Sequence, residues 1–189
     1  MANLTAAQVE EDVNYLIEGL DVNKRLIPSA STLLKKSAAI PFLTILLSFI
    51  STIVFYLSSD WNERTLYGFS HFFLNEGWVV VAPAAIIGAI FMAFTYSKLM
   101  MYFTVPEDVR KNSLILNHLQ KITVRVVKFF IFMMFLSLVL AAFNPLFTFA
   151  IPALLFVMIF AMGFIVGSEI NRFGTGLALE KVSSLIKKF

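Results

Sequence analysis

This 189-residue sequence contains two histidines, His71 and His118, the side-chain type best suited to bind a metal or transfer a proton near neutral pH. An apolar segment of membrane-spanning length separates them, so we expect them on opposite sides of a membrane. Neither stands beside carboxylates at ligand spacing, and the chain contains no cysteine. We therefore expect no metal, no cofactor and no enzymatic activity.

The apolar segments carry few groups that could do chemistry inside a membrane. No Asp, Glu, His or Arg falls in the central part of any of them. Transporters and proton relays usually place such residues there, although each costs at least ~2.5–3.5 kcal/mol. An ion-coupled transporter or a selective channel is therefore disfavoured. We expect each hydroxyl group in these segments to bond the carbonyl four residues earlier in its own helix, at Ser48, Ser51, Thr52, Thr95 and Ser137.

Positive charge is concentrated in residues 98–128, and two functional interpretations of it are open. The charges can orient the chain beside anionic lipid, or they can form a docking face for a protein partner, with the acidic N-terminal helix folding against the basic helix. Nucleic-acid binding is disfavoured, because the net charge is only +3 and acidic residues are interleaved. The candidate partner-binding residues are Arg110, Lys111, His118, Lys121 and Arg125.

Small residues recur at helical spacing in two of the apolar segments. Such rows let helix backbones approach closely in a membrane. We favour packing within one chain over contact between copies, and a homo-oligomer remains the alternative. The residues are Gly163 and Gly167, which form a GxxxG motif in the last segment, and Ala84, Gly88, Ala85 and Ala89 in the second.

The amino-acid composition indicates the class of protein to which these residues belong. Hydrophobic residues make up 59% of the chain and charged residues 14%, with a mean hydropathy of +0.82. A soluble domain averages about 45–50% and about 25%, respectively. We therefore predict an all-α, polytopic membrane protein with four transmembrane helices, because spans of about 20 residues match the ~30 Å hydrocarbon layer. The predicted spans are residues 37–58, 77–97, 124–143 and 146–167.

The last two spans are predicted from a single uncharged run, residues 129–168. One helix of these 40 residues would be about 60 Å long, twice the hydrocarbon layer. Asn144 is a preferred N-cap and Pro145 would then occupy the first helical position. We therefore predict a tight turn at Asn144-Pro145 between two spans, with Pro152 bending the second.

Two further boundaries follow from capping residues. Ser37 can cap the first span, which would place Pro41 in its first turn. Thr104 and Glu107 fit a capping box, so a helix should start near Val105 and continue without a break into the third span.

The segments outside the spans divide the chain into three parts. Residues 1–36 comprise an amphipathic helix over 5–20 and a linker; residues 37–168 form the membrane domain, including a helical loop at 98–123; and residues 169–189 form a tail helix after a break at Gly174 and Gly176. Thr5 with Gln8 fits a capping box for the first helix. Its apolar face would consist of Val9, Val13, Leu16 and Leu20.

Charge predicts the orientation of these parts. With four spans, 14 of the 15 Lys and Arg residues lie on the side that holds both termini. The positive-inside rule then places both termini in the cytoplasm, and we predict a multi-pass protein of the bacterial inner membrane. The opposite side receives only the tight turn and the aromatic loop 59–77. That loop is a second-choice partner-binding surface, with Trp61, Tyr67 and His71.

The predicted architecture resembles that of a known type of protein. It combines four short spans without intramembrane charge, the Lys35-Lys36 flank and basic cytoplasmic segments. It is similar to the small inner-membrane exclusion and immunity proteins of bacterial plasmids, namely TraS-type conjugative entry-exclusion proteins and the immunity proteins for pore-forming colicins. The resemblance implies a non-enzymatic protein that blocks a foreign partner at the membrane, and it assigns no functional residues. Two alternatives stay open: an accessory subunit of a transport or secretion complex, and a small oligomeric channel or carrier.

Overall fold

The computed structural model describes residues 5–19, 27–59 and 64–172, and within these ranges the chain is helical with no strand. Leu20, Trp61, Gly174, Gly176 and the predicted tail helix lie outside the described residues. The helices are α1 (Ala6–Gly19), α2 (Ala30–Ser58), α3 (Leu66–Phe72), the π-helical turn η2 (Phe73–Gly77), α4 (Trp78–Thr104), α5 (Glu107–Asn112), α6 (Leu114–Leu140) and α7 (Leu146–Arg172).

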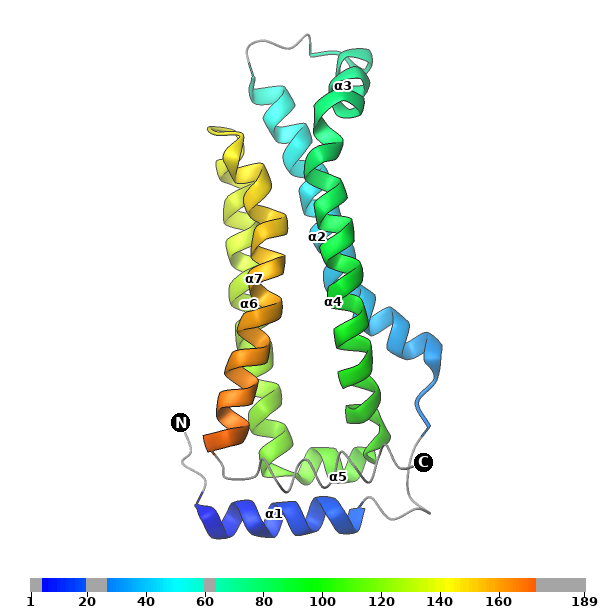
Figure 1. Cartoon of the computed structure of the whole chain (residues 1–189), viewed down its shortest axis with the longest axis vertical. Coiled ribbons are helices and arrows are strands. Elements are labelled where there is room, and N and C mark those ends of the chain that lie inside the picture. The colour runs from blue at the N-terminus through cyan, green and yellow to red at the C-terminus, as the bar shows by residue number, and fades with distance from the viewer. Residues whose placement is uncertain (1–4, 20–26, 60–63, 173–189) are drawn as a thin grey trace.

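Four helical stretches are long and apolar enough to cross a membrane, which confirms the predicted number of spans. They are Ala30–Ser58, Leu66–Thr104, Leu114–Leu140 and Leu146–Arg172. They form two antiparallel hairpins, α2 with α4 and α6 with α7, and the short helices α1 and α5 lie across one end of the bundle (Figure 1). Four such helices are compatible with a multi-pass membrane protein.

The bundle is held by side chains from all four long helices. Leu47 of α2, Phe91 of α4, Met134 of α6, and Leu155 and Met158 of α7 belong to one buried cluster. Many other large apolar side chains face outward, as expected where the surroundings are lipid rather than water. In such surroundings the helices associate mainly through van der Waals packing, so close approach of the backbones matters more than apolar area.

α2 and α4 approach each other closely at Gly88. A Cβ added there would lie 3.1 Å from Cβ of Pro41, and Ala84, one turn away, is fully buried. Ala85 and Ala89, in contrast, lie on the exposed side of α4. One of the two small-residue rows in this helix therefore forms the hairpin interface.

The GxxxG motif has a different place in the fold. A Cβ added at Gly163 or Gly167 would meet no atom within 4 Å, so the motif does not pack against the described part of the chain as we had favoured. It lies on the outward face of α7, where Phe164 is also exposed. Contact with a second copy stays the alternative interpretation of the motif.

The first span starts earlier than predicted. Ser29 is the N-cap of α2, and its hydroxyl accepts from the Thr32 amide at 3.3 Å. Ser37 is instead a buried helix-interior residue that donates to the Leu34 carbonyl, and Pro41 is buried well inside the helix. The expected linker residues from Ala30 onward thus belong to α2, whose first turns point away from the rest of the helix, a bend typical of an interior proline (Figure 1).

Much of the predicted loop 59–77 is helical. Thr65 caps α3 by accepting from the Gly68 amide at 3.0 Å, and α3 continues through η2 into α4. The rings of Phe69, Phe72 and Phe73 follow a helical spacing and pack against rings of α2, including Tyr56. The resulting helical stretch of 39 residues is about 58 Å long, well beyond the 77–97 span that we predicted.

The helix predicted to run unbroken from Val105 into the third span is interrupted. Thr104 stays in α4, where its hydroxyl donates to the Met100 carbonyl at 2.8 Å, so it makes no capping box with Glu107. α5 ends at Asn112, and Ser113 starts α6 as a new N-cap. The break lies at Ser113, whose backbone is extended, with φ −66° and ψ 124°.

The turn at Asn144-Pro145 is confirmed. Asn144 Oδ1 accepts from the Leu146 amide at 2.9 Å, at the start of α7. Ser137 does not bond its own helix as predicted; its hydroxyl donates across the hairpin to the Phe147 carbonyl at 2.8 Å. The two last spans are therefore joined by a short turn and an interhelical hydrogen bond.

Replacing Gly88 by leucine should destabilise the bundle by roughly 1–3 kcal/mol, because the new side chain would collide with Pro41 across the α2–α4 interface. Gly167→Leu is the matched control, since the same change meets open space there and should alter stability by less than about 0.5 kcal/mol. Thermal unfolding of both variants in detergent, followed by circular dichroism, measures the difference. Equal losses would contradict the assigned interface.

Candidate functional site

The carboxylate of Asp12 in α1 closes the N-terminus of α6. Its Oδ2 accepts from the Ser113 hydroxyl at 2.8 Å and from the Ile115 amide at 2.9 Å, and its Oδ1 accepts from the Leu114 amide at 3.0 Å. The residue is only 6% exposed. The first amides of a helix have no partner within the helix and carry its positive dipole end, so a carboxylate is the group they bind best.

Ser113 completes the cap. While its hydroxyl donates to Asp12, the same oxygen accepts from the Leu116 amide at 3.1 Å. Three consecutive amides at the start of α6 are thus satisfied, two of them by a residue about 100 positions earlier in the chain. This arrangement fixes α1 to the third span in position and in orientation.

Apolar contacts surround the cap. Val13 of α1 packs with the fully buried Ile115, and Leu16 packs with Val109 of α5. The backbone approaches closely as well, since a Cβ at Gly19 would lie 2.6 Å from Val109 Cγ2. The predicted apolar face of α1 is therefore buried against α5 and α6.

The capping box at the start of α1 is confirmed by two hydrogen bonds. The Thr5 amide donates to Gln8 Oε1 at 3.0 Å, and the Gln8 amide donates to the Thr5 hydroxyl at 3.4 Å. The role of Asp12 was not predicted from the sequence. Its signal was present, because Val9, Asp12, Val13 and Leu16 share one helical face, and a carboxylate within an apolar stripe indicates a buried partner.

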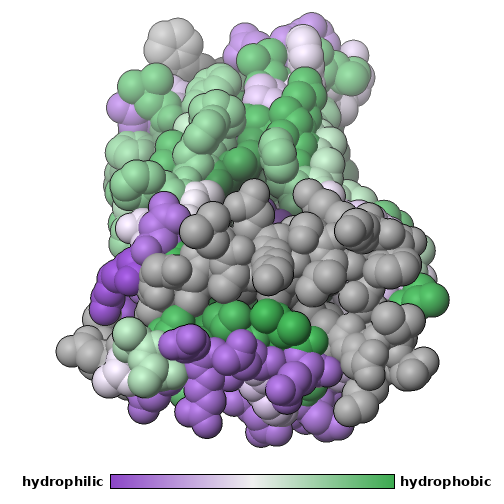
Figure 2. Space-filling view, turned by 60° about the horizontal axis from the view of Figure 1, so that its bottom comes forward, coloured by the Kyte–Doolittle hydropathy of each residue, from purple (hydrophilic) through white to green (hydrophobic). Residues whose placement is uncertain are grey.

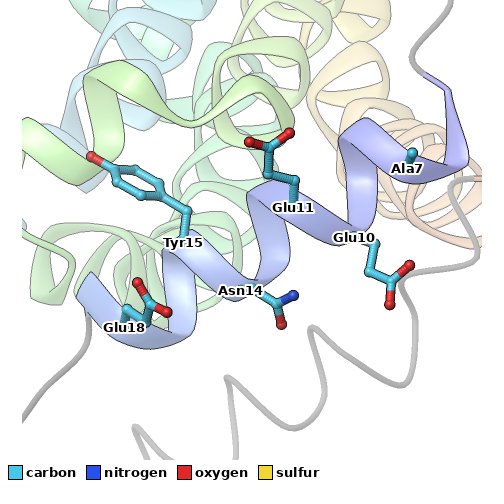
Figure 3. Close-up of a pocket in the computed structure, with 6 residues that line it drawn as sticks. All are labelled: Ala7, Glu10, Glu11, Asn14, Tyr15 and Glu18. Atoms are coloured by element: carbon cyan, nitrogen blue, oxygen red, sulfur yellow. The ribbon is translucent and has the colours of Figure 1, made fainter.

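The opposite face of α1 is exposed and polar. Figure 3 shows its side chains along the helix, where they line a shallow hollow. Figure 2 shows hydrophilic surface gathered at this end of the molecule and apolar surface on the shaft of the bundle. The residues of this face are Ala7, Glu10, Glu11, Asn14, Tyr15 and Glu18, and we call them the α1 outer face.

Charge pairing is not what docks the acidic helix. Within the described ranges no ion pair joins α1 to the basic segment; the ion pairs there are Lys111–Glu107, His118–Glu169 and Arg172–Glu169. The apolar stripe and the Asp12 cap hold α1 instead. The α1 outer face makes no ion pair with the other described residues.

The predicted basic residues have separate surroundings. The Lys111 ammonium lies 2.7 Å from the Glu107 carboxylate; this hydrogen bond and charge attraction raise the pKa of Lys111 and lower the pKa of Glu107. Arg110 stacks over the rings of Tyr102 and Phe103. Lys121 and Arg125 are exposed on α6.

His118 joins the start of α6 to the end of α7. Its Nε2 lies 3.3 Å from Glu169 Oε2, and the Glu169 carboxylate also meets Arg172 at 3.4 Å. Both members of the His118–Glu169 pair are about four-fifths buried. This pair therefore links the two helices of the second hairpin, α6 and α7.

The aromatic residues proposed as a second surface lie at the other end of the bundle. Tyr67 of α3 is 81% exposed, and His71 lies beside Asn75, with 3.0 Å between His71 Nδ1 and Asn75 Nδ2. The two histidines thus sit at opposite ends of the molecule (Figure 1). Among the residues that the structure describes, no group of three His, Asp or Glu side chains could hold a metal ion.

No protein-family model, curated protein sequence or solved structure matches this chain. The site is therefore interpreted from its own geometry. That geometry is a rigidly mounted helix with a polar outer face, placed across one end of a membrane bundle.

Asp12→Ala should release α1 from the bundle. The change removes three hydrogen bonds to a charged acceptor and leaves the Leu114 and Ile115 amides without their partner, for which we expect a loss of about 1.5–3 kcal/mol in the docking of α1. Hydrogen–deuterium exchange in detergent should show faster exchange throughout α1 and at these two amides.

Glu11→Ala is the matched control, because Glu11 neighbours Asp12 on the same helix but is exposed. Its exchange pattern should equal that of the native chain. Unchanged protection of α1 in Asp12→Ala would contradict the assigned role of the cap.

Proposed function

We propose that this protein is a non-enzymatic membrane protein that acts by binding another protein, and that its activity is exclusion of a conjugative partner or immunity to a membrane-active toxin. The observation that carries the proposal is the Asp12 cap, because it holds α1 in one orientation. A surface that is already ordered loses little conformational entropy when a partner binds.

The chemistry of the α1 outer face supports a protein partner with positive charge. Glu10, Glu11 and Glu18 are exposed there together with Tyr15, a residue type common in binding sites. Complementary charge speeds association and selects among partners. Lys121 and Arg125, exposed on α6, are the remaining members of the basic surface predicted from the sequence and would contact an acidic part of the same partner.

We propose further that both termini are cytoplasmic and that the membrane is the bacterial inner membrane. The support is the distribution of Lys and Arg, with 14 of 15 on the side of the termini in a four-span chain. This orientation places the α1 outer face in the cytoplasm.

Reporter fusions test the orientation. An enzyme that is active only outside the cytoplasm should be inactive when fused after Phe189 and active when fused after Phe143, at the turn between α6 and α7. The two fusions serve as controls for each other. Activity after Phe189 would overturn the proposed orientation.

Expression in a susceptible cell tests the function. The native chain should protect the cell from conjugative transfer or from a pore-forming toxin, and Asp12→Ala should reduce that protection about tenfold or more, because weaker docking of α1 lowers the binding-competent fraction. Glu76→Gln, which removes an exposed charge from η2 at the opposite end of the bundle, should leave it unchanged, with equal membrane levels verified by immunoblotting.

If panels of conjugative donors and of toxins leave the expressing cell as susceptible as its parent, both exclusion and immunity are excluded. Affinity capture from native membranes then tests the accessory-subunit alternative, in which the same face binds a transport or secretion complex.

One observation favours a second candidate function. The GxxxG motif at Gly163 and Gly167 packs against none of the described residues, and a contact there with a second copy is what an oligomeric channel or carrier would need. Ion flux in liposomes that is abolished by Gly167→Leu would support this alternative; flux that the change does not affect would not.

A further inference from the structure

Two cations converge on one aromatic ring where α2, α4 and α5 meet. The Lys36 Nζ of α2 lies 4.2 Å from the centroid of Phe103 in α4, and the Arg110 Cζ of α5 lies 4.8 Å from the same centroid. Arg110 also lies 5.0 Å from the centroid of Tyr102. Three segments separated in sequence thus bring two positive charges to one place.

Neither cation has an anionic partner among the described residues. Arg110 and Lys36 belong to none of the ion pairs there, and the Arg110 Nε is buried without a hydrogen-bond partner. Glu107 is close enough to be influenced by Arg110, but its carboxylate binds Lys111 at 2.7 Å. An unsatisfied buried donor is expensive, and cation–π attraction does not supply the missing acceptor.

The position of the cluster fits a membrane surface. Phe103 lies in the last turn of a helix that is apolar enough to span the bilayer. Met100, one turn earlier on α4, is about half exposed. Positive charge therefore borders apolar surface. An anionic phospholipid is complementary to this arrangement, because its negative headgroup can meet the charge and its acyl chain the apolar surface.

We propose that Lys36, Phe103 and Arg110 form a binding site for a phosphate group, carried by an anionic phospholipid of the leaflet on the α1 side. The planar guanidinium of Arg110 can donate two parallel hydrogen bonds to phosphate oxygens, and its unpaired Nε is one of the available donors. Lys36 adds a second charge, while Phe103 holds both cations in place. The site is independent of the protein-binding function proposed above.

Lipid retention by the purified full-length chain tests the site. The protein is exchanged into a zwitterionic detergent and given phosphatidylglycerol, phosphatidylcholine or inorganic phosphate at equal ionic strength. Native mass spectrometry measures bound lipid, and thermal unfolding measures stabilisation by each additive. We expect retention of phosphatidylglycerol over phosphatidylcholine and an unfolding temperature raised by phosphatidylglycerol alone.

Two variants and one control locate the effect. Arg110→Gln and Lys36→Gln should each weaken phosphatidylglycerol binding at least fivefold, whereas Lys121→Gln, which removes an equal charge from an exposed position on α6, should not. Lys36 is itself exposed, so Lys36→Gln keeps the test valid if Arg110→Gln does not fold.

The remaining outcomes are equally informative. Equal retention of the two lipids, or equal loss in Lys121→Gln, would overturn the proposal, because binding would then reflect general surface charge. Stabilisation by inorganic phosphate that equals that by phosphatidylglycerol and disappears in Lys36→Gln would support a phosphate site supplied from solution and overturn the lipid as its source.

Discussion

The contact on which the rest of this structure depends is the carboxylate of Asp12 at the first amides of α6. A helix that starts at a break in the chain exposes amides that need acceptors, and the Ser113 hydroxyl alone satisfies only one of them. Asp12 supplies the others, so the interruption between α5 and α6 and the crosswise position of α1 are two aspects of one arrangement. Because that arrangement buries the apolar face of α1, its acidic face can only point outward.

Inside the bundle a different constraint applies, since a hydroxyl in lipid can find an acceptor only within the protein. Ser48 was predicted to bond its own helix, but its buried hydroxyl has no hydrogen-bond partner among the described residues. Ser51 and Thr52 donate to carbonyls of α2 three residues earlier, not four as predicted, which satisfies them without linking helices. Ser137 instead bonds the Phe147 carbonyl and ties α6 to α7 next to their turn. Together with the close contact of Gly88 with Pro41, this shows that small and hydroxylated side chains join the helices where large apolar ones cannot specify a partner.

The sequence predicted what depends on length, hydropathy and local capping, and it missed what depends on distant contacts. The four spans and the Asn144 turn follow from local residues, and the structure has both. The start of α2 was misplaced because Pro41 suggested a first turn, although proline is also tolerated inside a membrane helix. The helical spacing of Phe69, Phe72 and Phe73 could have indicated α3. The partner of Asp12 could not be read, because nothing local connects it with Ser113.

The end of the bundle that carries α1 contains two places that attract an anion, and the described residues fill one of them. The amides at the start of α6 receive the Asp12 carboxylate, so that place is structural. The guanidinium of Arg110 and the ammonium of Lys36 receive aromatic rings but no carboxylate from the described residues. At the other end, the rings of Tyr56, Phe69 and Phe72 pack on one another. A charged group without a partner among the described residues marks a place where another molecule can bind. The structural anion site and the candidate binding site therefore lie at the same end of the protein.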